Sequence, residues 1–202
     1  MDLENHLQSK KSFIFGFDNV LFPEKDYLLQ VYYLFSEFIE YTEQKNAKAI
    51  LEFMREEFTS HGSVNVFERT AKAFDIDEKY KSNFMLLHEN ARLPLKLLLY
   101  QNMLMLLQEV VVERKNIFLM VQGFSLMQLN KIRQTEWHGL EQYLKLYFSQ
   151  ELEPSFTAKS IDFIIEQHEL ERKEVLFIGN GDEEQSAALS AGVEYLSAIK
   201  LF

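Results

Sequence analysis

The sequence predicts an α/β protein, a parallel β-sheet with helices on both faces and an all-helical segment inserted near its start. Two observations support this prediction. From residue 94 onward, short apolar runs alternate with amphipathic stretches, which is the pattern of a parallel sheet covered by helices. Between residues 24 and 93, apolar residues recur at helical spacing without a strand-like run. We therefore expect a core made of residues 1–23 and 94–202, and a helical insertion made of residues 24–93.

The elements follow in chain order. The first strand is expected in the apolar run that begins at Ser12 and ends just ahead of Asp18. The insertion should hold four amphipathic helices and stop before Pro94, because the residue before a proline disfavours helix. Further strands are expected at residues 117–121, 144–148, 175–178 and 195–198, with helices between them.

Composition narrows the classes of function. The chain has 202 residues, a formal net charge of −10 and no cysteine. A protein with this excess of acid is poorly suited to nucleic acid, which is bound by neutralising phosphates with Lys and Arg. The absence of cysteine excludes disulfides and thiolate metal sites. No apolar run reaches the length of a membrane span, and the polar first residues do not resemble a signal peptide. We expect a cytoplasmic protein that binds neither nucleic acid nor membrane.

Polar residues follow the predicted strands where each strand ends. Asp18 follows the first strand, Gln122 the second, and Asn180 and Asp182 a later one. Ligands of parallel sheets bind beyond the carboxyl ends of the strands. The sequence therefore predicts a site at this edge.

The stretch from Ser12 to Phe22 closely resembles the first motif of the haloacid dehalogenase (HAD) superfamily, in which a strand ends in Asp-x-Asp-x-Thr. The resemblance covers nearly the whole chain and is greatest to the branch with a helical cap inserted after this motif. It implies a Rossmann-like core and a cap domain. In that family the first aspartate is the nucleophile that attacks phosphorus, the second is the acid/base, and magnesium lies between them and the acids of the fourth motif. On this match, Asp18 takes the acid/base position.

The motifs depart from the family pattern at most of the chemically active positions. Gly16 stands at the position of the nucleophile and Val20 at that of the threonine. Val121, followed by Gln122, stands where the family has a hydroxyl. The stretch Glu153 to Phe156, with Ser155, replaces the lysine motif, and Asn180 replaces the first acid of the fourth motif. The expected pocket is degenerate and consists of Gly16, Val20, Val121, Gln122, Ser155 and Asn180.

The resemblance also bears on metal binding. Two carboxylates that would hold magnesium are absent at positions 16 and 180. Asp18, Asp182 and Glu184 remain as oxygen donors, and carboxylates at the start of a helix also have a purely structural explanation. We expect no bound cofactor, and leave open weak binding of magnesium by these three residues.

The leading interpretation is a HAD-like protein without catalytic activity, a pseudoenzyme that binds a small molecule or a protein partner. The main alternative is an active HAD-like phosphatase or other hydrolase that uses Asp18 and metal-bound water. A further alternative is that the helical cap acts mainly as an oligomerisation module, which would make the protein a homo-oligomer.

Overall fold

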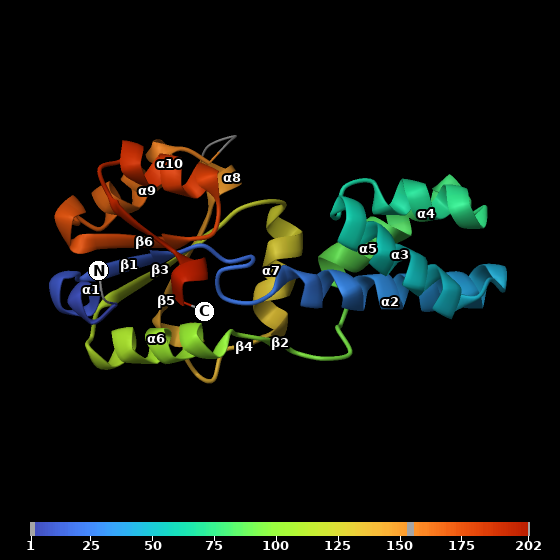
Figure 1. Cartoon of the computed structure of the whole chain (residues 1–202), viewed down its shortest axis with the longest axis horizontal. Coiled ribbons are helices and arrows are strands. Elements are labelled where there is room, and N and C mark those ends of the chain that lie inside the picture. Colours follow the sequence, from blue (N-terminus) through green and yellow to red (C-terminus); the bar gives the residue numbers. More distant parts are fainter. Residues whose placement is uncertain (1–2, 153–155, 202) are drawn as a thin grey trace. The chain divides into compact units, whose positions relative to one another are not determined.

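The computed structural model describes residues 3–152 and 156–201, which form two compact units (Figure 1). The first, here called the α/β unit, comprises Met1–Pro23, Leu98–Gln128 and Thr135–Phe202. The second, the helical unit, comprises Glu24–Leu97 and Leu129–Gln134. The helical unit starts where the insertion was expected to start. It extends a few residues beyond the expected end and also takes in a later segment.

In the part of the chain that the structure describes, the sheet of the α/β unit has five parallel strands in the order β5-β3-β1-β6-β7. Strand β1 is central, and its Phe13 lies beside Ile117 of β3 and Leu176 of β6. The strands are β1 (Ser12–Phe15), β3 (Asn116–Val121), β5 (Leu144–Phe148), β6 (Val175–Gly179) and β7 (Glu194–Ser197). The prediction of an α/β fold with a parallel sheet is confirmed.

Burial on both faces explains why the central strands are apolar throughout. Ile14, Phe118 and Phe177 belong to one buried cluster with Ile161 and Ile164 of helix α9. Figure 1 shows α9 and α10 on one face of this sheet and α6 on the other. The helices of this unit are α1 (Leu3–Ser9), α6 (Gln101–Val112), α8 (Ser149–Leu152), α9 (Ala158–Gln167) and α10 (Asp182–Ser190), with the short helices η2 (Glu141–Tyr143), η3 (Arg172–Glu174) and η4 (Ala198–Leu201).

Helix α1 was not predicted, because the first residues of the chain are mostly polar. The residue that follows it is anchored by charge: Lys10 is buried, and its Nζ lies 2.7 Å from a carboxylate oxygen of Glu194 in β7. The same Nζ donates a hydrogen bond to the carbonyl of Lys173. These contacts tie the start of the chain to the sheet.

Residues 24–97 of the helical unit, all of them described, contain four α-helices, as the apolar spacing predicted. They are α2 (Glu24–Glu43), α3 (Ala47–His61), α4 (Val66–Phe74) and α5 (Lys81–Asn90), with the short helix η1 (Glu78–Tyr80). Their shared core is aromatic: the rings of Phe35, Phe67 and Phe84 lie 5.1–5.7 Å apart between centroids. Helix α7 (Ser125–Gln134) contributes residues to both units, and β2 (Leu97–Leu98) and β4 (Thr135–Glu136) form a separate two-stranded sheet.

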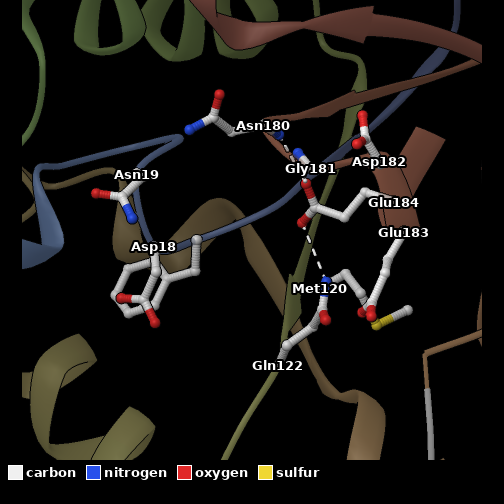
Figure 2. A pocket seen from close by; sticks show the side chains of 10 residues that line it. Asp18, Asn19, Met120, Gln122, Asn180, Gly181, Asp182, Glu183 and Glu184 are labelled. Atoms are coloured by element: carbon white, nitrogen blue, oxygen red, sulfur yellow. Dashed lines mark hydrogen bonds between the residues drawn. The ribbon is translucent and has the colours of Figure 1, made fainter. Parts of the chain in front are cut away.

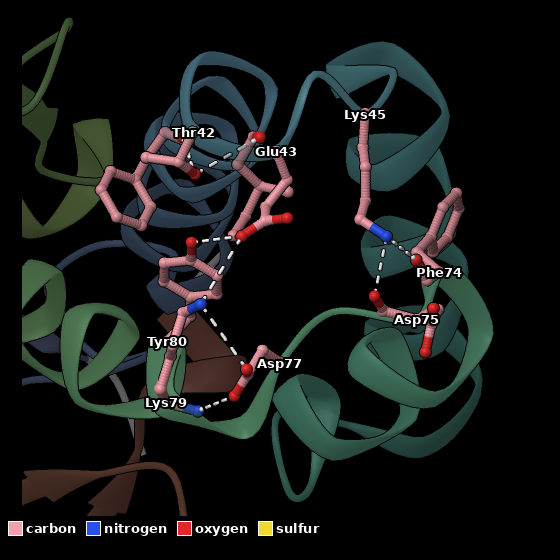
Figure 3. Close-up of polar contacts among 10 residues, drawn as sticks. Thr42, Glu43, Lys45, Phe74, Asp75, Asp77, Lys79 and Tyr80 are labelled. Atoms are coloured by element: carbon pink, nitrogen blue, oxygen red, sulfur yellow. Dashed lines mark hydrogen bonds and ion pairs between the residues drawn. The ribbon is translucent and has the colours of Figure 1, made fainter.

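Polar contacts close the loops of the helical unit (Figure 3). Lys45 Nζ donates to the carbonyls of Phe74 and Asp75 at 2.8 and 2.7 Å, where α4 ends. The hydroxyl of Tyr80 donates to the Glu43 carboxylate at the end of α2. A cation at a helix C-terminus satisfies carbonyls that have no partner within the helix.

No helix in the described part of the chain combines the length and the apolar character needed to cross a bilayer.

Candidate functional site

A cavity of about 370 Å³ lies in the α/β unit beyond the carboxyl ends of β1, β3 and β6. This is the edge at which the sequence predicted a site. Its lining residues are Phe17, Asp18, Asn19, Met120, Gln122, Asn180, Gly181, Asp182, Glu183 and Glu184. Four of these residues carry a carboxylate, and none is Lys, Arg or His. The cavity therefore has an acidic wall, in contrast to a site built to hold phosphate.

A tight turn after β1 presents Asp18 to the cavity. Asn19 takes a left-handed backbone conformation with φ of 57°, which asparagine tolerates better than most residues. The Asn19 N–H donates to the Phe22 carbonyl at 3.0 Å, and the ring of Phe22 packs on Phe17 with centroids 4.8 Å apart. Because Phe22 is fully buried, the turn is anchored on its apolar side.

Gln128 of α7 holds the side chain of Asp18. Its Nε2 donates to Asp18 Oδ2 and to the carbonyl of Gln122, both at 2.7 Å. Gln128 is only 2% exposed, so it is a fixed part of the wall and not a surface residue. Nothing in the sequence indicated this role, because the two partners are 110 positions apart.

Glu184, in the first turn of α10, turns its carboxylate back into the sheet edge (Figure 2). Its Oε2 accepts hydrogen bonds from the backbone N–H groups of Asn180 at 2.7 Å and Gly181 at 3.2 Å. Its Oε1 accepts from Gln122 Nε2 at 3.2 Å. The side chain is 9% exposed, and the carboxylate is held by three donors from two segments of the chain.

Burial raises the pKa of the Glu184 carboxyl above its ordinary value, and the nearby charge of Asp18 acts in the same direction. The hydrogen bonds from Asn180, Gly181 and Gln122 oppose this effect without cancelling it. Tyr195, whose hydroxyl donates to the Gly181 carbonyl at 3.4 Å, has its pKa raised to about 12 by burial and then by the Glu184 charge.

The seated carboxylate occupies the space next to two glycines. An ideal Cβ built on Gly16 would lie 2.6 Å from Glu184 Oε1, and one built on Gly179 would lie 2.4 Å from Glu184 Oε2. Both distances are shorter than the 3.0 Å below which Cβ contacts are essentially never found, so with a side chain at either position the flexible end of Glu184 would have to shift. Gly16 and Gly179 therefore provide the room that the Glu184 carboxylate occupies.

The residues present do not match the needs of magnesium. This ion requires near-octahedral oxygen ligands at about 2.1 Å. Both oxygens of Glu184 already face N–H donors, whose positive ends would oppose a cation in the same place. Within residues 3–152 and 156–201, no three His, Cys, Asp or Glu side chains are grouped closely enough to hold a metal ion.

The structure places the predicted residues in three groups. Asp18, Gln122, Asn180, Asp182 and Glu184 line the cavity, and Gly16 lies beneath Glu184. Val20 and Val121 are fully buried and do not line it. Ser155 and Glu153 lie outside the described residues.

A buried lysine of the helical unit was also missed by the sequence analysis. Lys131 of α7 is fully buried in the helical unit, and its Nζ lies 3.0 Å from Glu24 Oε1 and 5.2 Å from the ring centroid of Tyr27. A lysine in the polar helix 125–134 looks solvated in sequence, and nothing local distinguishes it from Lys159, which is exposed at the start of α9.

Comparisons with known proteins support the fold. No protein-family model matches the sequence, and a search of curated proteins finds no match. Solved structures do match. A candidate β-phosphoglucomutase from Thermotoga maritima aligns with a TM-score of 0.65 and 17% identity, over 91% of this chain and 82% of that one.

Two further structures align over most of their length. A hydrolase from Streptococcus pneumoniae has a TM-score of 0.56 and 14% identity, over 96% of both chains. The L-2-haloacid dehalogenase of Xanthobacter autotrophicus, solved with chloropropionic acid covalently bound, has a TM-score of 0.52 and 14% identity, over 92% of this chain and 76% of that one. The chain thus has the fold of the HAD-like hydrolases. At these identities the likeness concerns the fold alone.

Proposed function

We propose that this chain is a HAD-like protein that does not perform the covalent chemistry of that fold, and that it works as a binding or interaction protein. The position of Glu184 is the observation that supports this most strongly. Its Oε1 lies 2.6 Å from the position that the Cβ of a side chain at residue 16 would take. Glycine at this position supplies no nucleophile, and loss of the nucleophile in a covalent enzyme can cost about a millionfold in turnover.

The charge of the cavity supports the same proposal. Asp18, Asp182, Glu183 and Glu184 line it without a lysine or arginine among the lining residues. A phosphate ester brought into this cavity would meet like charge at short range, and like charges repel strongly where water is scarce. Phosphoryl transfer depends on cations that neutralise the transferring group.

The proposed partners are a small molecule or another protein in the cytoplasm. The net charge of −10 argues against nucleic acid as the ligand. The absence of cysteine is compatible with a reducing compartment.

One observation favours a hydrolase as the second candidate. Asp18 lines the cavity and is oriented by Gln128 through a 2.7 Å hydrogen bond. A fixed carboxylate can act as a general base on a water molecule, a role that needs no residue at position 16.

A surface of the helical unit favours the third candidate, self-association. A cavity of about 220 Å³ there is lined by Phe38, Leu86 and Leu87, and Leu86 is 53% exposed. Exposed apolar residues beside a hollow are common at protein contacts. Analytical ultracentrifugation of wild type and Leu86→Glu tests this candidate: dimers that Leu86→Glu abolishes would support it, and a monomeric wild type would exclude it.

Turnover decides between the first two candidates. Purified wild-type protein is assayed with phosphate monoesters and 2-haloacids, with and without Mg²⁺, beside the matched variant Asp18→Asn. We expect no turnover above the buffer rate for either protein. Turnover by wild type that Asp18→Asn abolishes would contradict the proposal and establish the hydrolase.

A further inference from the structure

The space around the Glu184 carboxylate has a defined shape. Gly16 closes it on the side of β1 and Gly179 on the side of β6, at the 2.6 and 2.4 Å separations given above for their absent Cβ atoms. Val20 leaves no alternative room, because its Cγ2 would lie 3.0 Å from a Cβ on Gly16. We call this space, bounded by Gly16, Gly179 and the donors of Asn180, Gly181 and Gln122, the Glu184 seat.

Hydrogen bonds hold the Glu184 carboxylate in the seat. Three N–H groups point at one carboxylate, and hydrogen bonds to a charged acceptor are stronger than those between neutral groups. If the carboxylate left, the N–H groups of Asn180 and Gly181 would lose their acceptor. Departure is therefore unfavourable unless something else takes its place.

We infer that Glu184 is the residue that determines what this pocket admits: its seated carboxylate excludes both a side chain at position 16 and any external oxyanion. This inference rests on the proposed function. It adds that the pocket is unsuited to the family's chemistry because Glu184 fills it, as well as because the nucleophile is missing. A side chain at residue 16 and the Glu184 carboxylate in its seat are mutually exclusive, so the flexible end of Glu184 would have to leave the seat. Restoring a carboxylate at position 16 thus requires that the Glu184 carboxylate move out or that residue 184 be shorter.

An experiment must distinguish exclusion of an anion by the space that Glu184 fills from exclusion by its negative charge. Glu183 is adjacent in sequence, lines the same cavity and carries the same charge. It makes no described hydrogen bond to the seat, so changing it removes a charge and leaves the seat filled. Glu184→Gln also removes a charge and leaves the seat filled, because glutamine has nearly the same size as glutamate. Glu184→Ala, by contrast, empties the seat.

The first test displaces the occupant. Gly16→Ala puts a methyl group against Glu184 Oε1, whereas the control Gly181→Ala adds one 3.9 Å from Glu184 Oε2, an ordinary contact, and keeps the same N–H donor. The measured quantity is the pKa of the Glu184 carboxyl, determined from carbon NMR shifts of the side chain as a function of pH. We expect Gly16→Ala to lower this pKa towards the usual range of glutamic acid and Gly181→Ala to leave it unchanged. An unchanged pKa in Gly16→Ala would overturn the inference.

The second test measures entry of an oxyanion. Inorganic phosphate is titrated by calorimetry into wild type, Glu184→Ala, Glu184→Gln and Glu183→Ala, after thermal melting has shown that each is folded. We expect Glu184→Ala to bind phosphate at least about tenfold more tightly than the other three proteins. An equal gain in Glu184→Gln or Glu183→Ala would show that charge and not occupancy excludes the anion, and no gain in a folded Glu184→Ala would also overturn the inference.

If Glu184→Ala does not fold, Glu184→Ser serves in its place, because serine is well tolerated near a helix N-terminus and still vacates the seat. The turnover assay on wild type remains separate from both tests. A wild type that hydrolyses esters would sink the proposed function. If the wild type is inactive and Glu184→Ala gains no affinity for phosphate, only the inference about Glu184 is wrong.

Discussion

The interior of the sheet and the loops at its carboxyl edge follow different rules. In β1 and β6 every side chain is buried, and Ile14, Phe118 and Phe177 pack against apolar residues of α9 and α10. At the edge, the buried carboxylate of Glu184 is held by two backbone N–H groups and one side-chain amide. The buried apolar residues of the interior specify the fold, and the polar groups of the loops form the cavity.

The largest effect is expected in the interior. Phe118→Ala should lower the free energy of unfolding by about 3–5 kcal/mol, because it removes a fully buried ring from β3, next to the central strand. Denaturant unfolding measures this. Leu146→Ala on the edge strand β5 is the control: Leu146 is 36% exposed, and its loss should cost far less. Equal losses would remove the distinction between interior and edge.

The second-largest loss of stability is expected for Gly16→Asp. The new side chain meets Glu184 Oε1, so the variant should lose about 1–3 kcal/mol through overpacking, and should gain no phosphatase activity. Pairing it with Glu184→Ser should recover most of the lost stability, whereas pairing it with Glu183→Ser should not. Recovery in both pairs would mean that general charge repulsion causes the loss.

Gln128→Leu probes the other wall of the cavity. It removes a donor from Asp18 Oδ2 and from the Gln122 carbonyl, and should lower the free energy of unfolding by about 1–2 kcal/mol. The same exchange at the exposed Gln142, which donates to the Gly139 carbonyl at 3.0 Å, should have little effect. If Gln128→Leu left the free energy of unfolding unchanged, Asp18 would not be positioned by this amide.

The smallest expected effect is a dependence on pH. Because the folded-state pKa of Glu184 is raised, the folded protein holds its proton more tightly than the unfolded chain does. Stability from this group is therefore complete below the ordinary glutamate pKa. It is lost as pH rises through the raised value, by at most about 1.4 kcal/mol for each pH unit that separates the folded and unfolded pKa.

Glu184→Gln cannot lose a proton. Its stability relative to wild type should therefore increase as pH rises through the same window, with Glu183→Gln as the control of equal charge change. Thermal or denaturant unfolding at a series of pH values measures the difference. A constant difference between Glu184→Gln and wild type across that window would show that the carboxyl is not perturbed.

The sequence predicted the parts of this structure that depend on local pattern. Apolar runs located the strands, helical spacing located the four helices of the helical unit, and the order of strands and turns brought Asp18 and Asn180 to one edge. The positions of Gln128 and Glu184 could not be predicted, because each depends on distant residues. Gln128 acts on Asp18 from another element, and Glu184 can turn inward only where Gly16 and Gly179 leave room. The sequence leaves the acids after β6 with two explanations, favourable charges at a helix N-terminus or a weak metal site, since it does not show which way a side chain turns.

The most direct test of the central claim is a crystal structure of the wild-type protein grown with Mg²⁺ and orthovanadate, an analogue of phosphate. We predict that Glu184 stays in its seat, with its carboxylate within hydrogen-bond distance of the Asn180 and Gly181 N–H groups, and that only water lies beside Asp18. An ordered magnesium ion bound by Asp18 and Glu184, with vanadate above Gly16, would contradict the account.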